Sequence, residues 1–274
     1  MKKIIRSFAV VCLAAMTLTA CTKDVKEVEN NEISESTLTQ IKALGFGTEG
    51  AKKVDGGYLV EGDIFLDDAT LSSTPSSPNM VIAQEEQYRT FNLVSSTKHP
   101  VINVALNNSS SAHDAAFSAA LDEAIRRYNA ENLTVKFQRV TSGADITVVA
   151  FYEQSNTLGS AGFPTSTGDP YNQVRMNTYH YSTSTGTTNT NYIATIMAHE
   201  LGHCIGFRHT DYMRRAYSCG YGGNEGQERN GVGAVHIPGT PTGPDANSWM
   251  LACIGSNVNR PFNANDKIAL SYVY

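Results

Sequence analysis

Two histidines four residues apart, His199 and His203, lie in a stretch with helical periodicity. Residues at this spacing lie one above the other on a helix, so both imidazoles can reach one metal ion. Glu200 follows His199 directly, and from there its carboxylate can face a metal-bound water without being a ligand. The spacing therefore predicts a catalytic metal site carried by a helix.

The histidine pattern continues past this helix. Gly206 follows His203 by three residues, and His209 follows it by six. Because glycine tolerates positive φ, Gly206 can end the helix and bring His209 back as a third ligand. Three neutral imidazoles and a water make the open tetrahedral arrangement of a catalytic zinc site. The alternative is a helix with surface histidines and no metal, which the length of the pattern and its helical context disfavour.

Apolar periodicity predicts the elements that would position these residues. Ile193, Ile196, Met197 and Leu201 form the core stripe of a helix over 191–204. The other predicted elements are helices over 33–44, 112–128 and 265–274, and strands over 58–66, 100–106, 133–137, 146–151 and 173–177. Stretches rich in Gly, Pro, Ser or Thr are expected to be irregular: 67–80, 159–169 and 218–247. The pattern predicts an α+β fold, with a boundary within 67–80.

The stretch from His199 to His209 resembles the extended zinc signature of the metzincin metalloproteases, H-E-x-x-H-x-x-G-x-x-H. Within that group, HELGHCIGFRHTDY is similar to the HEIGH-type metallopeptidases of bacteria. The resemblance covers about residues 90–274 and implies a zincin domain with a twisted, mostly parallel sheet, an active-site helix and a C-terminal helix. It also implies a methionine turn beneath the metal, and Met250 fits that position.

The same resemblance implies where a substrate would bind. The strand at 173–177 would be the edge strand above the cleft and would hold a peptide backbone by strand addition. The Gly/Pro-rich loop before Met250 would form the wall of the specificity pocket. In related enzymes a tyrosine two residues after the methionine assists the oxyanion, but Ala252 stands at that position here. Tyr212 is a candidate for this role, and the alternative is that Tyr212 is a packing aromatic.

Zinc chemistry implies a mechanism for such a site. Zinc lowers the pKa of its bound water to about 7. Glu200 would accept a proton as that water attacks the peptide carbonyl, and would deliver it to the leaving amine. We therefore expect a zinc endopeptidase with one catalytic Zn²⁺ and protein or peptide substrates. The alternatives are a catalytically silent, zinc-containing surface-binding lipoprotein, which the retention of Glu200 speaks against, and a narrow processing enzyme with one partner protein.

A second motif precedes the catalytic unit. The segment Val60-Glu61-Gly62-Asp63-Ile64 resembles the F-x-G-D motif of astacin prosegments, in which the aspartate binds the catalytic zinc and displaces the water. Val60 replaces the aromatic residue of that motif. The alternative is a β-turn that uses Gly62 and Asp63. If the resemblance holds, residues 22 to about 89 form a prosegment, removed near Arg89 or in the 67–80 loop.

The N-terminus has the pattern of an export signal. A basic start is followed by an apolar run, from Phe8 to about Met16, that is too short to span a bilayer. Leu18-Thr19-Ala20-Cys21 resembles a bacterial lipobox, in which Cys21 is lipidated and becomes the first mature residue. The alternative is an ordinary signal peptide cut near Ala20. We expect an exported protein, anchored by lipid to the cell envelope, at the periplasmic or surface face of the outer membrane.

This pattern gives a complete domain organisation. The expected parts are a lipoprotein signal peptide at 1–20, a tether at 21–31, a prosegment-like region at 32–89 and a metalloprotease domain at 90–274. The formal net charge of −5 and the lack of a Lys/Arg block argue against nucleic-acid binding. Calcium is compatible with the acidic loops, but the sequence has no calcium-loop motif. We expect a monomer.

Cysteine usage also fits export. Three cysteines remain in the folded part, enough for one bridge and one leftover thiol in an oxidising compartment. All three pairings of Cys204, Cys219 and Cys253 are open. Cys219–Cys253 is favoured because both residues lie in the loop-rich C-terminal part, whereas Cys204 falls in an apolar helical pattern.

Overall fold

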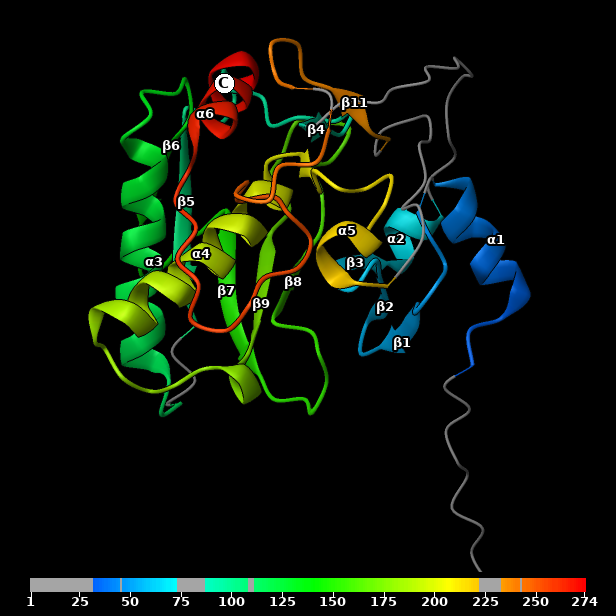
Figure 1. Ribbon diagram of the computed structural model, residues 1–274, viewed down its shortest axis with the longest axis horizontal. Coiled ribbons are helices and arrows are strands. Elements are labelled where there is room, and N and C mark those ends of the chain that lie inside the picture. Colours follow the sequence, from blue (N-terminus) through cyan, green and yellow to red (C-terminus); the bar gives the residue numbers. More distant parts are fainter. Residues whose placement is uncertain (1–31, 45, 73–86, 108–110, 222–232, 242) are drawn as a thin grey trace, which may run out of the picture. The chain divides into compact units, whose positions relative to one another are not determined.

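The computed structural model describes residues 32–44, 46–72, 87–107, 111–221, 233–241 and 243–274 (Figure 1). All elements named below belong to the compact unit formed by residues 32–274. The predicted signal peptide, Cys21 and the tether lie outside the described residues. Within the described part, no helix is long and apolar enough to cross a membrane.

Four parallel strands form one half of an eight-stranded sheet. In spatial order they are β9 (Gln173–Asn177), β7 (Ile146–Phe151), β5 (Val101–Leu106) and β6 (Lys136–Arg139), which is an edge strand of the sheet. Next to β9 lies β8 (Gly159–Ala161), which runs antiparallel to it. Strands β5 and β7 are rich in β-branched residues, which pack well on a pleated, half-buried surface.

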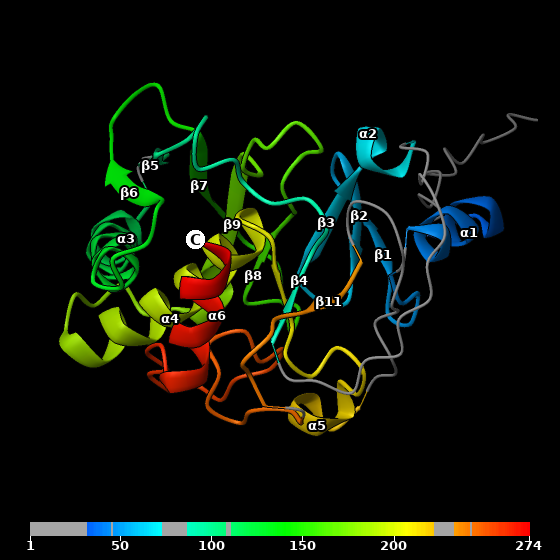
Figure 2. The same ribbon diagram turned by 90° about the horizontal axis from the view of Figure 1, so that it is seen from above.

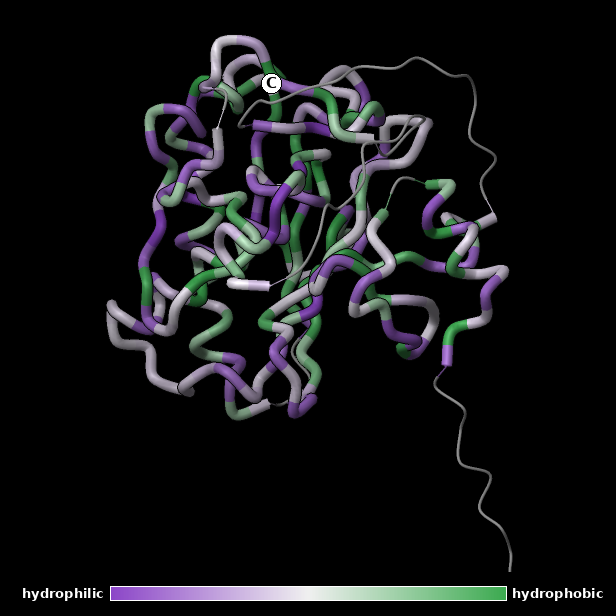
Figure 3. Tube along the Cα trace, turned by 45° about the vertical axis from the view of Figure 1, so that its right-hand side comes forward, coloured by the Kyte–Doolittle hydropathy of each residue, from purple (hydrophilic) through white to green (hydrophobic). Residues whose placement is uncertain are grey.

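Three helices cover one side of these strands. Helix α3 (Asp114–Asn129) packs along α4 (Thr187–Cys204), and both contact the sheet (Figure 2). Helix α6 (Ala264–Val273) begins at a capping box formed by Asn263 and Asp266. Figure 3 shows hydrophobic residues concentrated along the central strands and hydrophilic residues along the outer loops. The main apolar core therefore lies between the helices and the parallel strands, and every residue of α4 from Tyr192 to Cys204 is buried in or beside it.

The N-terminal region adds three strands to the same sheet. After helix α1 (Glu35–Ala43), strands β1 (Lys52–Val54), β2 (Gly57–Val60) and β3 (Ile64–Asp67) form an antiparallel meander that leads into the short helix α2 (Asp68–Leu71). Strand β3 then pairs with β8 in parallel. The full strand order is β1-β2-β3-β8-β9-β7-β5-β6.

A second, small sheet lies beside the first. Strand β4 (Tyr88–Arg89) pairs with both β10 (Phe207–Arg208) and β11 (Val235–His236). A 3₁₀ turn, η1 (Thr178–His180), follows β9, and a short helix, α5 (Ala216–Cys219), follows β10. This sheet fixes the chain directly after the zinc helix, where the third histidine lies.

The structure corrects three of the sequence-based expectations. The strand expected over 58–66 is a hairpin, because the tight turn at residues 61–63 separates β2 from β3. The stretch 159–169 was expected to be irregular but contains β8, whose small residues carry no strand signal. The strand at 173–177 is not an edge strand, since β8 and β7 flank it. The other predicted helices and strands lie within a few residues of the observed ones. The sequence did not predict β1, β4, β10, β11, α2 or α5, and α2 and β11 fall in stretches that were expected to be irregular.

Candidate metal centre

Helix α4 places His199, Glu200 and His203 in one buried layer. Gly202 allows this layer to approach the segment around Met250. A Cβ atom at Gly202 would lie 2.6 Å from the Met250 sulfur and 3.1 Å from the Trp249 indole nitrogen. The glycine of the motif is therefore required by close packing beneath the helix, and any larger residue would push the methionine away.

The third histidine reaches the layer through a sharp turn at Gly206. Its φ of +110° is one that side-chain-bearing residues rarely adopt. A Cβ atom there would also meet the Asn92 carbonyl at 3.0 Å. After this turn the chain enters β10 and presents His209, which is 1% exposed. The predicted return of the third histidine is what the structure shows.

The three imidazoles converge through their Nε2 atoms. His203 Nε2 lies 3.0 Å from His199 Nε2, and His209 Nε2 lies 3.3 Å from it. The Nδ1 atom of His199 lies 2.8 Å from the Trp249 carbonyl, and that of His203 lies 2.8 Å from the Phe207 carbonyl. A carbonyl only accepts, so each Nδ1 carries the proton and each Nε2 presents a lone pair.

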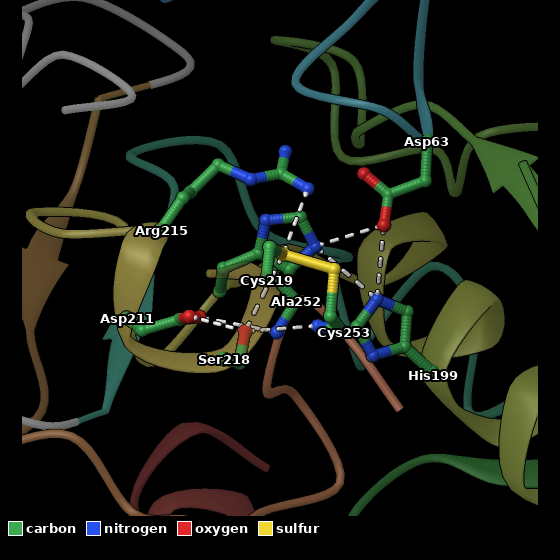
Figure 4. Close-up of a disulfide and its surroundings, with 9 residues drawn as sticks. Asp63, His199, Asp211, Arg215, Ser218, Cys219, Ala252 and Cys253 are labelled. Atoms are coloured by element: carbon green, nitrogen blue, oxygen red, sulfur yellow. Dashed lines mark hydrogen bonds and ion pairs between the residues drawn. A yellow bond between two sulfur atoms is a disulfide. The ribbon is translucent and has the colours of Figure 1, made fainter. Parts of the chain in front are cut away.

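Asp63 completes the cluster from the N-terminal side. It sits at the tip of the β2–β3 hairpin, and its Oδ2 lies 3.0 Å from His209 Nε2 and 3.5 Å from His199 Nε2 (Figure 4). The ligand atoms of the four residues all lie within 4.8 Å of one another. Burial would raise the pKa of Asp63, but its interactions with His209 and His199 outweigh this effect and hold that pKa well below its usual value.

This geometry fits one zinc ion. Converging lone pairs at 3.0–3.3 Å repel one another unless a cation lies between them. Tetrahedral zinc with bonds of about 2.0–2.1 Å separates its ligand atoms by about 3.3 Å, close to the observed spacing. Burial and the charges of His199 and His209 lower the pKa of His203 well below its usual value, which keeps the imidazole neutral, as metal binding needs.

Glu200 lies beside these four residues but is not one of the possible metal ligands. Its side chain is buried, and among the described residues its Oε2 has no hydrogen-bond partner. Burial and the negative charge of Asp63 raise its pKa well above the usual value. Glycine at position 159 makes room for the carboxylate, because a Cβ atom there would lie 2.8 Å from Glu200 Oε1. Strand β8 therefore needs a glycine where it faces the zinc helix.

The segment around Met250 is held from two sides. Asp266 accepts hydrogen bonds from the Ser248 hydroxyl at 2.7 Å and the Trp249 N–H at 3.2 Å. Burial raises the pKa of this carboxyl group to about 6. On the other side, Asp211 Oδ1 accepts the Ala252 N–H at 3.1 Å. The methionine turn is thus fixed between α6 and the chain that follows the third histidine.

A disulfide joins Cys219 at the end of α5 to Cys253 in the same segment (Figure 4). The Ser218 hydroxyl bonds Asp211 and also accepts the Cys253 N–H at 3.0 Å. Cys204 remains a free, buried thiol, as its place in the apolar pattern predicted. The favoured pairing of Cys219 with Cys253 is confirmed.

A cavity of about 620 Å³ opens beside the histidine cluster. Helix α4 contributes Thr195, Ile196, His199 and Glu200 to its lining, and the hairpin that carries Asp63 forms the opposite side. The wall was expected to come from the loop before Met250. Instead it is formed chiefly by the chain after Met250, and among the described residues of 218–247 only Tyr221 lines it.

Comparison with protein families agrees with this geometry. Residues 60–274 match the model of a family described as dual-action HEIGH metallo-peptidases. The chain belongs to this family. It is therefore a zinc metallopeptidase, a hydrolase acting on proteins or peptides, and its mixed α/β fold is compatible with a metzincin-like domain. A search of curated proteins finds no match.

The match bears on two details of the metallopeptidase. The motif here reads HELGH, with Leu201 where the family's name has isoleucine, and Leu201 is fully buried in the core. The matched range begins at Val60, so the turn that carries Asp63 lies within it.

The remaining candidate residues have structural surroundings. Tyr212 is fully buried and packs edge-on against Tyr88, with ring centroids 4.2 Å apart, which favours the packing alternative. Sequence patterns gave no signal for three residues of the site. Gly159 lies in a strand that the sequence did not predict, and Glu61 belongs to no spacing pattern that indicates a site. Arg260 lies in a loop, outside any recognisable motif.

Proposed function

We propose that this metallopeptidase is an endopeptidase in which Glu200 is the general base and acid. The observation that supports this role is the unpartnered Glu200 carboxylate oxygen, buried beside the histidine cluster at the cavity. A bound zinc ion would polarise the peptide carbonyl and acidify water at the site. Glu200 takes the proton from the attacking water and gives it to the leaving amine. Its raised pKa suits it to hold that proton between the two steps.

The chain's other residues orient this chemistry. His199, His203 and His209 hold the metal, and the Trp249 and Phe207 carbonyls fix the orientation of the first two rings. Gly159 leaves space for the Glu200 carboxylate, and Met250 supports the helix from below. These roles follow from contacts within the folded chain and need no movement of the core.

We propose further that the uncleaved chain is latent. The Asp63 carboxylate occupies the side of the histidine cluster that faces the cavity, where an attacking water has to bind. Strand β3 covers the outer edge of β8, since the Ala161 N–H donates to the Asp63 carbonyl at 3.0 Å. The N-terminal region therefore blocks both the metal and the strand edge that could pair with a substrate backbone.

A buried ion pair holds this block in place. Glu61 Oε2 lies 2.9 Å from the Arg208 guanidinium, and the two side chains are only 2% and 1% exposed. Glu61 Oε1 also accepts the Gly47 N–H at 3.0 Å. The Arg208 guanidinium lies over the rings of Phe46 and Phe163. Because Arg208 directly precedes His209, this contact ties the hairpin to the metal centre.

We propose that residues 1–20 direct export and that lipid on Cys21 anchors the mature chain to the cell envelope. The basic start, the short apolar run and the lipobox-like residues support this. The Cys219–Cys253 disulfide also suits an oxidising compartment. Labelling of growing cells with a radioactive fatty acid tests it: wild type should incorporate label, and Cys21→Ser should not.

The test of the enzymatic mechanism compares residues 22–274 with matched variants. Bound zinc and cleavage of a mixed peptide library are measured for wild type, Asp63→Ala, Glu200→Gln and the double variant. We expect zinc in all four and cleavage that is strongest in Asp63→Ala and absent wherever Glu200 is replaced. Cleavage that survives Glu200→Gln would contradict the role of Glu200. Zinc without cleavage in any variant would favour a silent, zinc-containing binding protein.

The latency proposal has its own outcome in this experiment. Asp63→Asn is nearly isosteric, but its amide is a poor zinc ligand, so it should activate the uncleaved chain almost as well as Asp63→Ala. Asp55→Asn is the matched control, because Asp55 lies in the same region, in the β1–β2 turn, and is exposed. Equal activity of wild type and Asp63→Asn would refute latency through Asp63 and leave the assignment of Glu200 intact.

A further inference from the structure

The cavity beside the histidine cluster is lined by an arginine, Arg260, whose side chain forms no ion pair with any residue that the structure describes. Arg260 lies after Met250 and is half-buried. Its backbone N–H donates to the Thr195 hydroxyl at 3.0 Å. Within the described ranges, however, its guanidinium makes no hydrogen bond, ion pair or ring contact. Partly buried charges are usually paired, so an unpaired one in a cavity calls for a ligand.

Neighbouring cations differ from Arg260 in this respect. Lys52, on the cavity rim, pairs with Glu153 at 3.1 Å. Arg127, behind Thr195, donates to Glu123 at 2.9 Å and to the Thr195 hydroxyl at 3.1 Å. Burial lowers the pKa of Arg260, but the negative charges of Asp266, Asp211 and Asp245 oppose this effect. The guanidinium therefore stays protonated at neutral pH.

The position of Arg260 relative to the metal is fixed by α4. Thr195, to which its backbone is bonded, lies four residues before His199 on the same helix. Four residues of helix span about 6 Å. Between the two positions on α4 the cavity is lined by Ile196, and Leu251 from the chain after Met250 adds a second apolar side chain to the lining. A short acidic side chain can cross this apolar stretch and reach the guanidinium.

We propose that Arg260 determines substrate specificity by binding a carboxylate on the leaving-amine side of the scissile bond. This inference rests on the proposed function, in which Glu200 delivers its proton to the leaving amine. The amine and its residue must then lie on the side of Glu200, and the cavity extends from Glu200 toward Arg260. A guanidinium fork binds a carboxylate through two parallel hydrogen bonds, which neither an amide nor an alcohol reproduces.

Two kinds of peptide carry such a carboxylate. One has Asp or Glu directly after the scissile bond, and the other ends at that residue with a free C-terminal carboxylate. Of these two carboxylates we favour the one on the side chain. A substrate side chain points into the cavity and can cross the apolar stretch between His199 and Arg260. Blocked peptides that differ only in Asp against Asn, or Glu against Gln, test the first source. Unblocked peptides and their C-terminal amides test the second.

The experiment uses the full mature chain with Asp63→Ala, so that the cavity is open, and compares cleavage rates by mass spectrometry. We expect acidic peptides to be cleaved about 10- to 100-fold faster than their amide counterparts. Arg260→Met should abolish this ratio, Arg260→Lys should keep part of it, and Arg260→Glu should reverse it in favour of Lys. Lys267→Glu is the control, because Lys267 is half-exposed on α6 and does not line the cavity.

A binding measurement separates this inference from the proposed function. Trp249 is the only tryptophan of the chain and lines the cavity, so its fluorescence reports occupancy. With Glu200→Gln added to Asp63→Ala, the Asp and Asn peptides should differ in Kd by a similar factor, and Arg260→Met should remove the difference. Peptide cleavage without acidic preference would overturn the inference alone. Loss of all cleavage would overturn the proposed function, and binding would then decide the role of Arg260. A preference that persists in Arg260→Met overturns the inference in either assay.

Discussion

The sheet is stabilised differently on the two sides of β8. Toward β9, the parallel strands and helices α3, α4 and α6 share one large apolar core. Toward β3, the N-terminal strands have a small cluster around Ile41, Phe46 and Leu66, and depend also on polar contacts with the metal centre. Apolar burial is non-directional, whereas buried ion pairs lose their stabilisation when one partner is removed. The difference predicts that the N-terminal half of the sheet detaches more easily than the catalytic half, which carries the zinc helix.

Removal of the negative charge of Glu61, buried at the β2–β3 hairpin, should have the largest effect on how the N-terminal strands are held. Glu61→Gln removes a buried carboxylate that lies 2.9 Å from the Arg208 guanidinium, and breaking such a buried pair costs about 3–5 kcal/mol. We expect the N-terminal region to detach, cleavage by the uncleaved chain to rise at least tenfold, and residues 32–72 to become sensitive to trypsin. Glu35→Gln, an exposed change on α1 outside the cavity lining, should do neither.

A substitution that leaves an empty space in the main apolar core should lower activity instead of raising it. Leu121 is fully buried on α3, and Leu121→Ala should lower the free energy of unfolding by about 3 kcal/mol. Cleavage should fall rather than rise, because the zinc helix packs on α3. Urea unfolding and bound zinc measure both effects. An increase in activity would show that the two halves are not energetically separate.

Protonation of Asp266 should tune the stability of the catalytic half. Its pKa is raised from 3.8 to about 6, so between these values the folded chain binds more protons than the unfolded chain. Its contribution to stability is therefore complete below pH 4 and is lost as the pH rises through 6, by up to about 3 kcal/mol. The difference in unfolding free energy between wild type and Asp266→Asn should show this slope. A difference that is independent of pH would contradict it.

The smallest expected effect concerns the strand at the boundary. Gly159→Ala should displace the Glu200 carboxylate, since the new Cβ atom would lie 2.8 Å from Oε1. We expect kcat of the Asp63→Ala chain to fall about tenfold, which corresponds to about 1.4 kcal/mol, with the melting temperature almost unchanged. Gly255→Ala, where the added atom would meet only ordinary contacts, is the matched control.

The sequence predicted the catalytic half of the sheet better than the N-terminal half. His199, His203 and His209 follow a spacing that helix geometry enforces, and α3 and α4 have clear apolar stripes. In contrast, β8 consists of Gly, Ser and Ala and forms because its neighbours pair with it. The same limit applies to Glu61 and Arg208, which are far apart in sequence and meet only through the hairpin turn. Long-range pairing leaves no local pattern.

The bond between Cys219 and Cys253 has a consequence for how the protein matures. It ties the wall of the cavity to α5, so the substrate-binding side is complete only after two thiols have been oxidised. While these thiols are reduced, the hydrogen bonds of Ser218 and Asp211 have to hold this wall. Oxidation of two thiols is therefore part of the assembly of the binding site.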